Sequence, residues 1–275
     1  MIRESVAAGL LYPEDPETLH ASIRSLLQST TVERNDARAI ISPNGKWKDT
    51  GPYCAAAMKA AASREPELII LIATPNDDIG PRILLPESDV FTTPIGPIPV
   101  ATEVISDLAD SSTRFVYDEI AHLGDDGIEV QLPYIRYLFA GVPIVPLFVG
   151  RIPEDLVRVA VTALELAARG RRTLYVASAN LSTLTTPGLS DYQSRTVFHW
   201  LVSNDSTDLT GLLEELSEPP RSIGALSVVR YCCRRLSAPS LISRGIMETV
   251  GDNSAYRVEY GALAYYPADN ETSQD

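Results

Sequence analysis

Lysine is scarce in this chain. Only three lysines occur in 275 residues, all between positions 46 and 59, and arginine supplies the rest of the positive charge. Acidic residues outnumber basic ones 36 to 23, which gives a formal net charge of −13, and lysine and arginine form no long run. Binding to nucleic acid or to an anionic membrane surface draws on clustered basic side chains. The composition therefore argues against nucleic acid and membranes as partners.

Long hydrophobic runs are also missing. No stretch approaches the roughly 18 apolar residues of a membrane-spanning helix, and residues 1–5 include an acid and lack the apolar core of a signal peptide. The three cysteines, Cys54, Cys232 and Cys233, are an odd number and two of them are adjacent, which argues against a disulfide framework. We therefore expect a cytoplasmic protein with reduced thiols.

Three hydrophobic segments run directly into polar residues. Segment 68–78 reads Leu-Ile-Ile-Leu-Ile-Ala-Thr-Pro-Asn-Asp-Asp, and its unbroken aliphatic run stopped by proline predicts a strand buried on both faces. Segments 37–42 and 173–178 repeat the design and lead into Pro-Asn-Gly and Ala-Asn. Ligands of open α/β sheets bind beyond the carboxyl ends of the strands. The functional site is therefore predicted where these three loops converge.

Strands and helices alternate in the pattern typical of an α/β fold. We predict a single-domain layered sandwich over 1–267, with a central mixed, largely parallel sheet flanked by helices, and a disordered tail at 268–275. Segments 37–42 and 68–74 are predicted to be neighbouring parallel strands. Further strands are expected at 143–149, 172–178 and 257–265, short proline-broken strands at 84–93 and 95–100, and helices at 16–28, 52–63, 101–108, 133–139, 154–168, 191–202, 207–217 and 221–236.

Four segments, in matching order, resemble one known family. Residues 3–12 (Arg-Glu-Ser-Val-Ala-Ala-Gly-Leu-Leu-Tyr) are similar to an Arg-x-x-x-x-Ala-Gly-x-Trp-Tyr opening, and Leu132-Pro133-Tyr134, residues 144–150 and residues 260–263 follow in the family's order. The chain thus resembles the MEMO family, also called AmmeMemoRadiSam system protein B, which is related in fold to class III extradiol dioxygenases. The resemblance implies the same α/β sandwich with its site at the strand ends.

The positions that match the family's metal-binding histidines hold other residues. Its Pro-His-Ala-Gly-Tyr loop becomes Pro-Asn-Gly-Lys-Trp with Asn44, its Gly-Pro-Ser-His-His loop ends in Asn76 and Asp77, its Glu-His-Ser-x-Glu motif keeps only Glu129, and its late cysteine falls near Glu218. Iron and copper sites of this kind need imidazole or thiolate donors. We therefore expect a divergent member without the family's metal site and without a cofactor.

The histidines that are present do not restore such a site. His20, His122 and His199 lie outside the motif positions, and no metal-ligand spacing links them. Each is interpreted as a structural or surface histidine.

The first functional hypothesis is a metal-independent acid/base catalyst, of the lyase, isomerase or cyclase type, acting on a small molecule or modified peptide in an acidic crevice. Such a catalyst needs a buried carboxylate with a raised pKa. Glu129, Asp126 and Asp77 are the candidate catalytic residues, and the first two are three residues apart, which places them on one side of a helical turn. The candidate substrate-binding residues are Asn44, Trp47, Asn76, Asn180, Ser182, Tyr192 and Arg221.

Two alternatives stay open. Carboxylates and amides are the oxygen donors that Mg²⁺ and Ca²⁺ prefer, although no calcium-loop spacing occurs. The other alternative is a non-catalytic pseudoenzyme or adaptor, which binds a peptide or partner protein in the same crevice, as the family resemblance implies. A homo-oligomer is compatible with the sequence, and neither the substrate nor the oligomeric state can be read from it.

Overall fold

The computed structural model describes residues 1–151, 153–203, 209–234, 236, 238–251 and 254–267, and the tail predicted at 268–275 lies outside them. The strands are β1 (Ile2–Arg3), β2 (Ala39–Ser42), β3 (Leu68–Ala73), β4 (Ile83–Leu85), β5 (Val90–Phe91), β6 (Ile98–Pro99), β7 (Phe115–Tyr117), β8 (Ile144–Val149), β9 (Thr173–Ser178), β10 (Ser240–Gly251) and β11 (Ser254–Tyr265). The helices are α1 (Pro16–Ser29), α2 (Trp47–Lys59), α3 (Thr102–Ser111), α4 (Glu119–Gly124), α5 (Leu132–Leu138), α6 (Glu154–Ala167), α7 (Pro187–Val202), α8 (Leu209–Glu215) and α9 (Ile223–Cys232), with a 3₁₀ turn at Glu129–Gln131.

The main sheet of the described chain has eight strands in the order β10-β11-β2-β9-β3-β8-β4-β7. Its four central strands, β2, β9, β3 and β8, are mutually parallel, whereas β11 is antiparallel to β2 and β4 is antiparallel to β8. The predicted mixed, largely parallel sheet of an α/β fold is confirmed. A small sheet of β1, β5 and β6 lies beside it.

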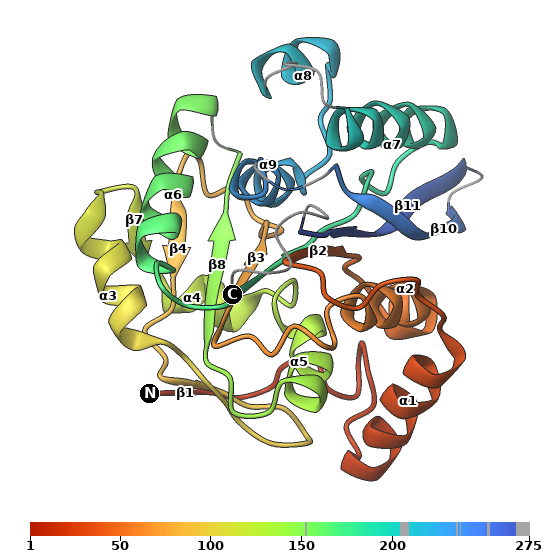
Figure 1. Cartoon of the computed structure of the whole chain (residues 1–275). Coiled ribbons are helices and arrows are strands. Elements are labelled where there is room, and N and C mark those ends of the chain that lie inside the picture. The colour runs from red at the N-terminus through yellow and green to blue at the C-terminus, as the bar shows by residue number, and fades with distance from the viewer. Residues whose placement is uncertain (152, 204–208, 235, 237, 252–253, 268–275) are drawn as a thin grey trace.

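Helices cover both faces of the main sheet (Figure 1). Helices α3, α6 and α9 pack together on one face, and α1, α2 and α5 pack on the other. Every residue of β2, β3 and β8 is buried, because a strand between two helix layers has no solvent-facing side. This explains the unbroken hydrophobic runs of these strands.

One predicted strand pairing is wrong. Strands β2 and β3 both pair with β9, which lies between them, so they are not neighbours. The register aligns the last residues of the three strands, with Ser178 opposite both Ser42 and Ala73. The loops that follow these strands therefore leave the sheet at one level, as the position of the predicted site requires.

Helix α2 begins five residues before the predicted start. Its first residue is Trp47, and Pro52 lies inside the helix, where proline removes one backbone hydrogen bond. The first turn nevertheless buries Trp47, Thr50 and Gly51. We attribute the longer helix to this burial, which offsets the missing bond.

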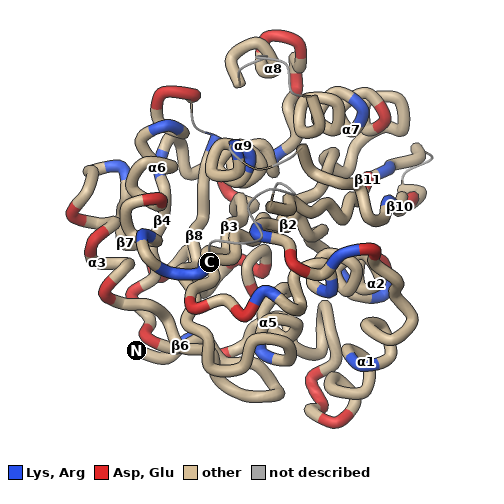
Figure 2. The backbone as a smooth tube through the Cα atoms, viewed as in Figure 1, with Lys and Arg blue, Asp and Glu red and all other residues tan. Residues whose placement is uncertain are grey.

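Several elements have no counterpart in the predictions. Strand β10 forms a hairpin with β11, of which only the second strand was expected, and β7 and α4 fall in a stretch with no predicted element. Among the described helices, none is both long enough and apolar enough to cross a bilayer. Acidic and basic residues are interspersed over the helices and loops in Figure 2.

Candidate functional site

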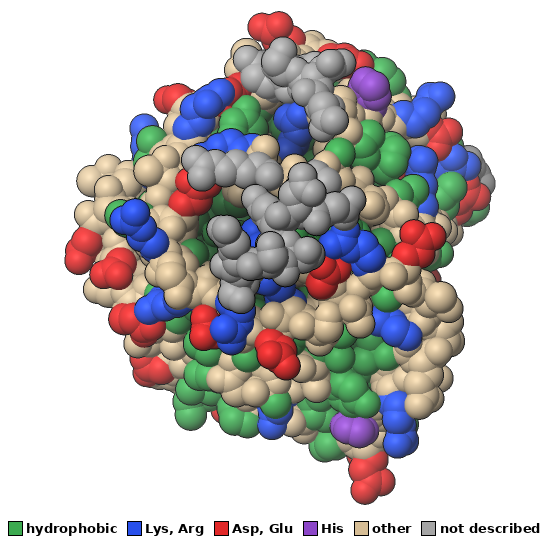
Figure 3. Space-filling view, in the orientation of Figure 1, with side chains coloured by type: hydrophobic (Ala, Val, Ile, Leu, Met, Phe, Trp, Pro, Cys, Tyr) green, Lys and Arg blue, Asp and Glu red, His purple; other side chains and the backbone are tan. Residues whose placement is uncertain are grey.

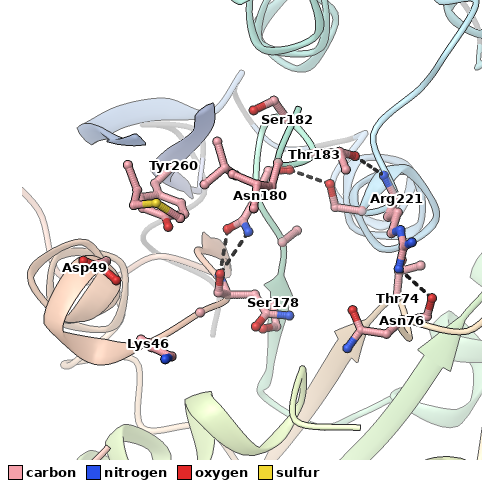
Figure 4. Close-up of a pocket in the computed structure, with 17 residues that line it drawn as sticks. Lys46, Asp49, Thr74, Asn76, Ser178, Asn180, Ser182, Thr183, Arg221 and Tyr260 are labelled. Carbon is pink, nitrogen blue, oxygen red and sulfur yellow. Dashed lines mark hydrogen bonds between the residues drawn. The ribbon is translucent and has the colours of Figure 1, made fainter. Parts of the chain in front are cut away.

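A cavity of about 470 Å³ lies beyond the carboxyl ends of β2, β3 and β9. Figure 4 shows its walls, which come from the loops after these strands, from the segment before α9 and from the β10–β11 hairpin. Its lining is rich in amides and hydroxyls. The lining residues are Asn44, Gly45, Lys46, Asp49, Thr74, Asn76, Ser178, Ala179, Asn180, Ser182, Thr183, Leu184, Arg221, Ser222, Met247, Val258 and Tyr260.

Two asparagines join the loops at the floor of the cavity. The backbone N–H of Asn44 donates to Asn180 Oδ1 at 2.9 Å, and Asn180 Nδ2 donates back to the carbonyl oxygen of Asn44 at 2.9 Å. The loops after β2 and β9 are thereby held by a reciprocal pair of hydrogen bonds. The side-chain amide of Asn44 takes no part in this pair.

An arginine forms one wall of the cavity. Arg221 Nη1 donates to the carbonyl oxygen of Asn76 at 2.6 Å, and the backbone N–H of Arg221 donates to Thr183 Oγ1 at 3.2 Å (Figure 4). Within the described residues, no carboxylate forms an ion pair with Arg221, whose side chain is exposed. The guanidinium is therefore positioned by backbone contacts and faces the cavity with its charge uncompensated by that part of the chain.

The opposite wall carries Lys46, Asp49 and Tyr260 (Figure 4). Burial raises the pKa of Tyr260 to about 12, and the negative charge of Asp49 adds to the effect. This phenol therefore remains protonated at neutral pH and can donate a hydrogen bond. Met247 and Val258 of the hairpin add apolar surface.

The cavity is not the acidic crevice that the sequence predicted. Two of its charged lining residues, Lys46 and Arg221, are cationic, and Asp49 is the single acid among the described residues that line it. The carboxylates proposed for catalysis do not line it. The structural reason for their absence from the lining differs among Glu129, Asp126 and Asp77.

Glu129 is fully buried and binds the N-terminal segment. Its carboxylate accepts hydrogen bonds from Arg3 Nη1 (2.7 Å), Ser5 Oγ (2.7 Å) and Tyr12 OH (2.7 Å), and also from the backbone N–H groups of Val6 (3.0 Å) and Ala7 (2.7 Å). Burial alone would raise the pKa of Glu129, but the charge of Arg3 and these hydrogen bonds lower it below the usual value. The raised pKa expected of a catalytic acid is absent here.

The other two candidate acids, Asp126 and Asp77, do not line the cavity either. Burial and the charge of Asp125 raise the pKa of the half-buried Asp126, which is the direction predicted for a catalytic carboxylate. Asp125 itself accepts from the backbone N–H groups of Asn76 (2.7 Å) and Gly127 (2.8 Å) and so shapes the loop after β3. Asp77 is exposed to solvent.

The structure places the two predicted aromatic residues, Trp47 and Tyr192, outside the wall of the cavity. Trp47 is buried between Tyr12 and Tyr134, with ring centroids 5.5 and 4.4 Å away, and its indole N–H donates to the carbonyl of Val130. Tyr192 lies on α7 and donates to the carbonyl oxygen of Glu215 at 3.1 Å. Trp47 belongs to the core because α2 starts early, and Tyr192 belongs to the contact of α7 with α8.

The remaining predicted binding residues do line the cavity. They are Asn44, Asn76, Asn180, Ser182 and Arg221. Ser182 is itself fixed, since its hydroxyl accepts from the backbone N–H of Glu259 at 2.8 Å and bonds Ser190 Oγ at 2.8 Å.

Sequence reasoning missed several lining residues. Lys46, Asp49 and Ser178 adjoin predicted positions and could have been found from their place in the strand-end loops. Met247, Val258 and Tyr260 come from the hairpin, and no sequence signal connects them to loops at 43–46 and 74–76. Only the sheet order brings them together.

The side chains of the cavity do not fit an iron or copper ion. The cavity presents the side-chain amides of Asn44, Asn76 and Asn180, whereas such ions need imidazole or thiolate. Within the described part of the chain, no three His, Cys, Asp or Glu side chains group closely enough to hold a metal ion. We therefore derive no reaction step through a metal.

Comparisons with known proteins identify the family of this chain. The sequence profile described as "Memo-like protein" matches residues 3–196. A MEMO1 family protein of Nitrosopumilus maritimus is 25% identical over 96% of this chain and 100% of its own length, and one of Thermotoga neapolitana is 28% identical over 74% and 83%. The crystal structure of the uncharacterized protein JW3007 of Escherichia coli K12 covers 82% of this chain and 98% of its own, with a TM-score of 0.49 and 14% identity. Because the profile spans well over half of the sequence, the chain belongs to the Memo-like protein family.

Proposed function

We propose that the protein binds a small organic anion, one that bears a carboxylate or phosphate group, in the cavity at the strand ends. The observation that supports this most is Arg221, whose guanidinium stands in the cavity wall, is oriented by the carbonyl of Asn76 and has no carboxylate partner in the described chain. Guanidinium groups bind carboxylates and phosphates through paired N–H donors.

The rest of the lining suits such a ligand. Lys46 adds a second positive charge across the cavity, amides and hydroxyls offer both donors and acceptors, and Leu184, Met247 and Val258 can contact a carbon skeleton. A few convergent polar groups on an otherwise partly apolar wall are typical of small-molecule sites. On this proposal the protein is a non-catalytic binding protein, but its ligand is a small anion rather than the peptide or partner protein of the alternative that the sequence left open.

The test measures anion binding with defined probes. Isothermal titration with inorganic phosphate, citrate and phosphoserine, and with uncharged glycerol as the comparison, should show binding of at least one anion. Arg221→Met should weaken that binding roughly 10-fold to 100-fold, because a hydrogen bond to a charged group contributes about 1.5–3 kcal/mol. Arg24→Met is the matched control, since Arg24 is an exposed arginine of α1 that does not line the cavity. Equal binding by native protein and Arg221→Met would contradict the proposal.

A metal-independent acid/base step remains a second candidate because of Asp126. Its raised pKa is what a general acid needs. If the protein converts an anion that it binds, Asp126→Asn should abolish turnover while leaving the dissociation constant of that anion unchanged. If Asp126→Asn changes neither turnover nor binding, this candidate is excluded.

A further inference from the structure

Strand β10 is the outermost strand at one end of the main sheet. It pairs with β11 on its inner side, and no described element pairs with its outer side. In Figure 1 it lies at the right-hand margin of the molecule, beyond β11. With twelve residues it is as long as any strand of the described chain, and its outer edge presents a row of backbone donors and acceptors.

The usual protection of an exposed edge is missing from most of this strand. Proteins block such edges with proline, charged side chains such as lysine, bulges or very short strands. Strand β10 contains neither proline nor lysine, its charged residues Arg244 and Glu248 form ion pairs with β11, and its one register shift lies at its beginning, between Leu241 and Ser243. From Ser243 to Gly251 its pairing with β11 is regular. This regular part is therefore available for pairing with another strand.

The alternate residues Arg244, Ile246, Glu248 and Val250 share one face of the strand. Ile246 is 53% exposed and Val250 is 78% exposed. Arg244 forms an ion pair with Glu259, and Glu248 with Arg257, both on β11. Hydrophobic, basic and acidic side chains accordingly lie together on this margin in Figure 3. The face combines apolar surface with charges of both signs.

We infer that β10 pairs antiparallel with β10 of a second copy of this chain, around a two-fold axis at Ile246. In such a pair, the residue numbers of directly opposed residues add up to the same total along the strands. Two opposed residues either both direct their backbone N–H and C=O groups toward the partner strand or both direct them away from it. Their numbers therefore differ by an even number, and the two-fold axis passes through a residue position rather than between two residues. An axis at Ile246 places Arg244 opposite the partner's Glu248 on both sides and Ile246 opposite its own copy.

Neighbouring registers are disfavoured by the same side chains. An axis at Arg244 or Glu248 would oppose two like charges, which destabilises a cross-strand pair. An axis at Gly245 would put Arg244 opposite isoleucine, and one at Met247 would put Glu248 opposite isoleucine. Only the axis at Ile246 matches charge with opposite charge and apolar with apolar residues, and this complementarity selects the second copy as the partner.

The paired strand also contributes to the cavity. Met247 of β10 lines it, as do Val258 and Tyr260 of β11. A second copy that adds a strand to β10 would therefore restrain one wall of the cavity without contacting a ligand.

The first test is the oligomeric state of the full chain. Light scattering after gel filtration, over a range of protein concentrations, should show a dimer that dissociates on dilution. Ile246→Lys places two like charges opposite each other and removes a buried apolar pair, so the dimer should dissociate roughly tenfold more readily or worse. Ile120→Lys is the matched control because Ile120 is 83% exposed on α4, away from β10, and it should leave the dimer intact.

The second test determines the register by oxidative crosslinking. Opposed residues of antiparallel strands have Cα atoms about 4.5–5.5 Å apart, within disulfide reach, so Ile246→Cys should form a crosslinked dimer on a non-reducing gel. Val250→Cys is more exposed but would lie eight strand positions, about 26 Å, from its own copy, and it should not crosslink. A monomer at every concentration, or equal crosslinking of both variants, would overturn the inference.

Discussion

Replacing Glu129 by glutamine tests whether this carboxylate anchors the N-terminal segment or performs chemistry. In the structure, its side chain is 0% exposed and pairs with Arg3, which is 1% exposed, at 2.7 Å. Glutamine keeps the size of the side chain and removes the negative charge. The amide nitrogen of glutamine would also face N–H groups whose hydrogen bonds the carboxylate of Glu129 accepts.

The expected loss of stability is large. Removing one partner of a buried ion pair costs about 3–5 kcal/mol, because the other charge stays buried without compensation. Domains are stable by only about 5–15 kcal/mol, so Glu129→Gln should lose a substantial part of the free energy of unfolding. The melting temperature should fall by roughly 10 °C.

Urea denaturation followed by circular dichroism measures the effect. Glu103→Gln is the control, since its carboxylate is 65% exposed and pairs with Arg171 at 3.5 Å; it should change stability by less than about 1 kcal/mol. The double variant Arg3→Met with Glu129→Gln should lose less than the sum of the single variants, because it removes both charges.

One outcome would refute this reasoning. If Glu129→Gln unfolds at the same urea concentration as the native protein but loses a ligand-dependent activity, the carboxylate is catalytic and its five hydrogen bonds do not stabilise the fold.

Three further predictions follow from close contacts, burial and the amide pair. Gly224→Ala should destabilise the protein by about 2–4 kcal/mol in urea denaturation, because the added Cβ would lie 2.3 Å from the carbonyl oxygen of Gly150. Gly188→Ala on α7 is the control: its added Cβ would have no neighbouring atom within 4 Å, so this variant should be neutral or stabilising. Burial lowers the pKa of His122 from 6.5 to about 4, so that between these pH values the unfolded chain binds more protons than the folded protein. The free energy of unfolding should therefore fall by about 3 kcal/mol at most as the pH drops from 6.5 to 4. The variant His122→Gln should lose this pH dependence. Asn180→Asp removes the amide donor of the reciprocal pair and adds negative charge to the cavity floor, so titration should show anion binding weakened about tenfold or more.

The sequence predicted the central sheet well because these strands carry their burial in their composition. The hydrophobic runs at 68–74, 143–149 and 172–178 correspond to β3, β8 and β9 within a residue or two. Helix α1 was also clear, since Asp15 caps it by accepting from the backbone N–H of Thr18 at 2.8 Å, as the Asp-Pro-Glu start indicates.

Elements whose stability depends on distant contacts were missed. Strand β10 is exposed and mixes glycine, charged and apolar residues, so neither alternation nor a hydrophobic run identifies it. The start of α2 was misplaced because Pro52 is a local breaker that burial of Trp47 overrides. The order of β2, β9 and β3 reflects packing across more than 100 residues, which local patterns do not encode.

The residues of the site, like the elements of the fold, could be predicted only where their position along the chain identifies them. Position relative to strand ends identified Asn44, Asn76 and Asn180, because the carboxyl ends of parallel strands meet at one edge. The position of a residue relative to the strand ends could not distinguish an acid that faces the cavity from an acid that faces the N-terminal segment. Glu129 was predicted to be catalytic because it matches the last glutamate of the family motif, and its ion pair was missed because Arg3 lies 126 positions away.

The order of the sheet has a consequence for synthesis on the ribosome. Strand β2 ends at residue 42, but its two neighbours are β9, which begins at residue 173, and β11, which begins at residue 254. At about 5–20 residues per second, the wait before β9 begins is roughly 7–26 s. During that time four residues that are all buried in the finished protein have no strand to pair with. Nascent chains shorter than about 178 residues should therefore engage chaperones and be sensitive to proteases.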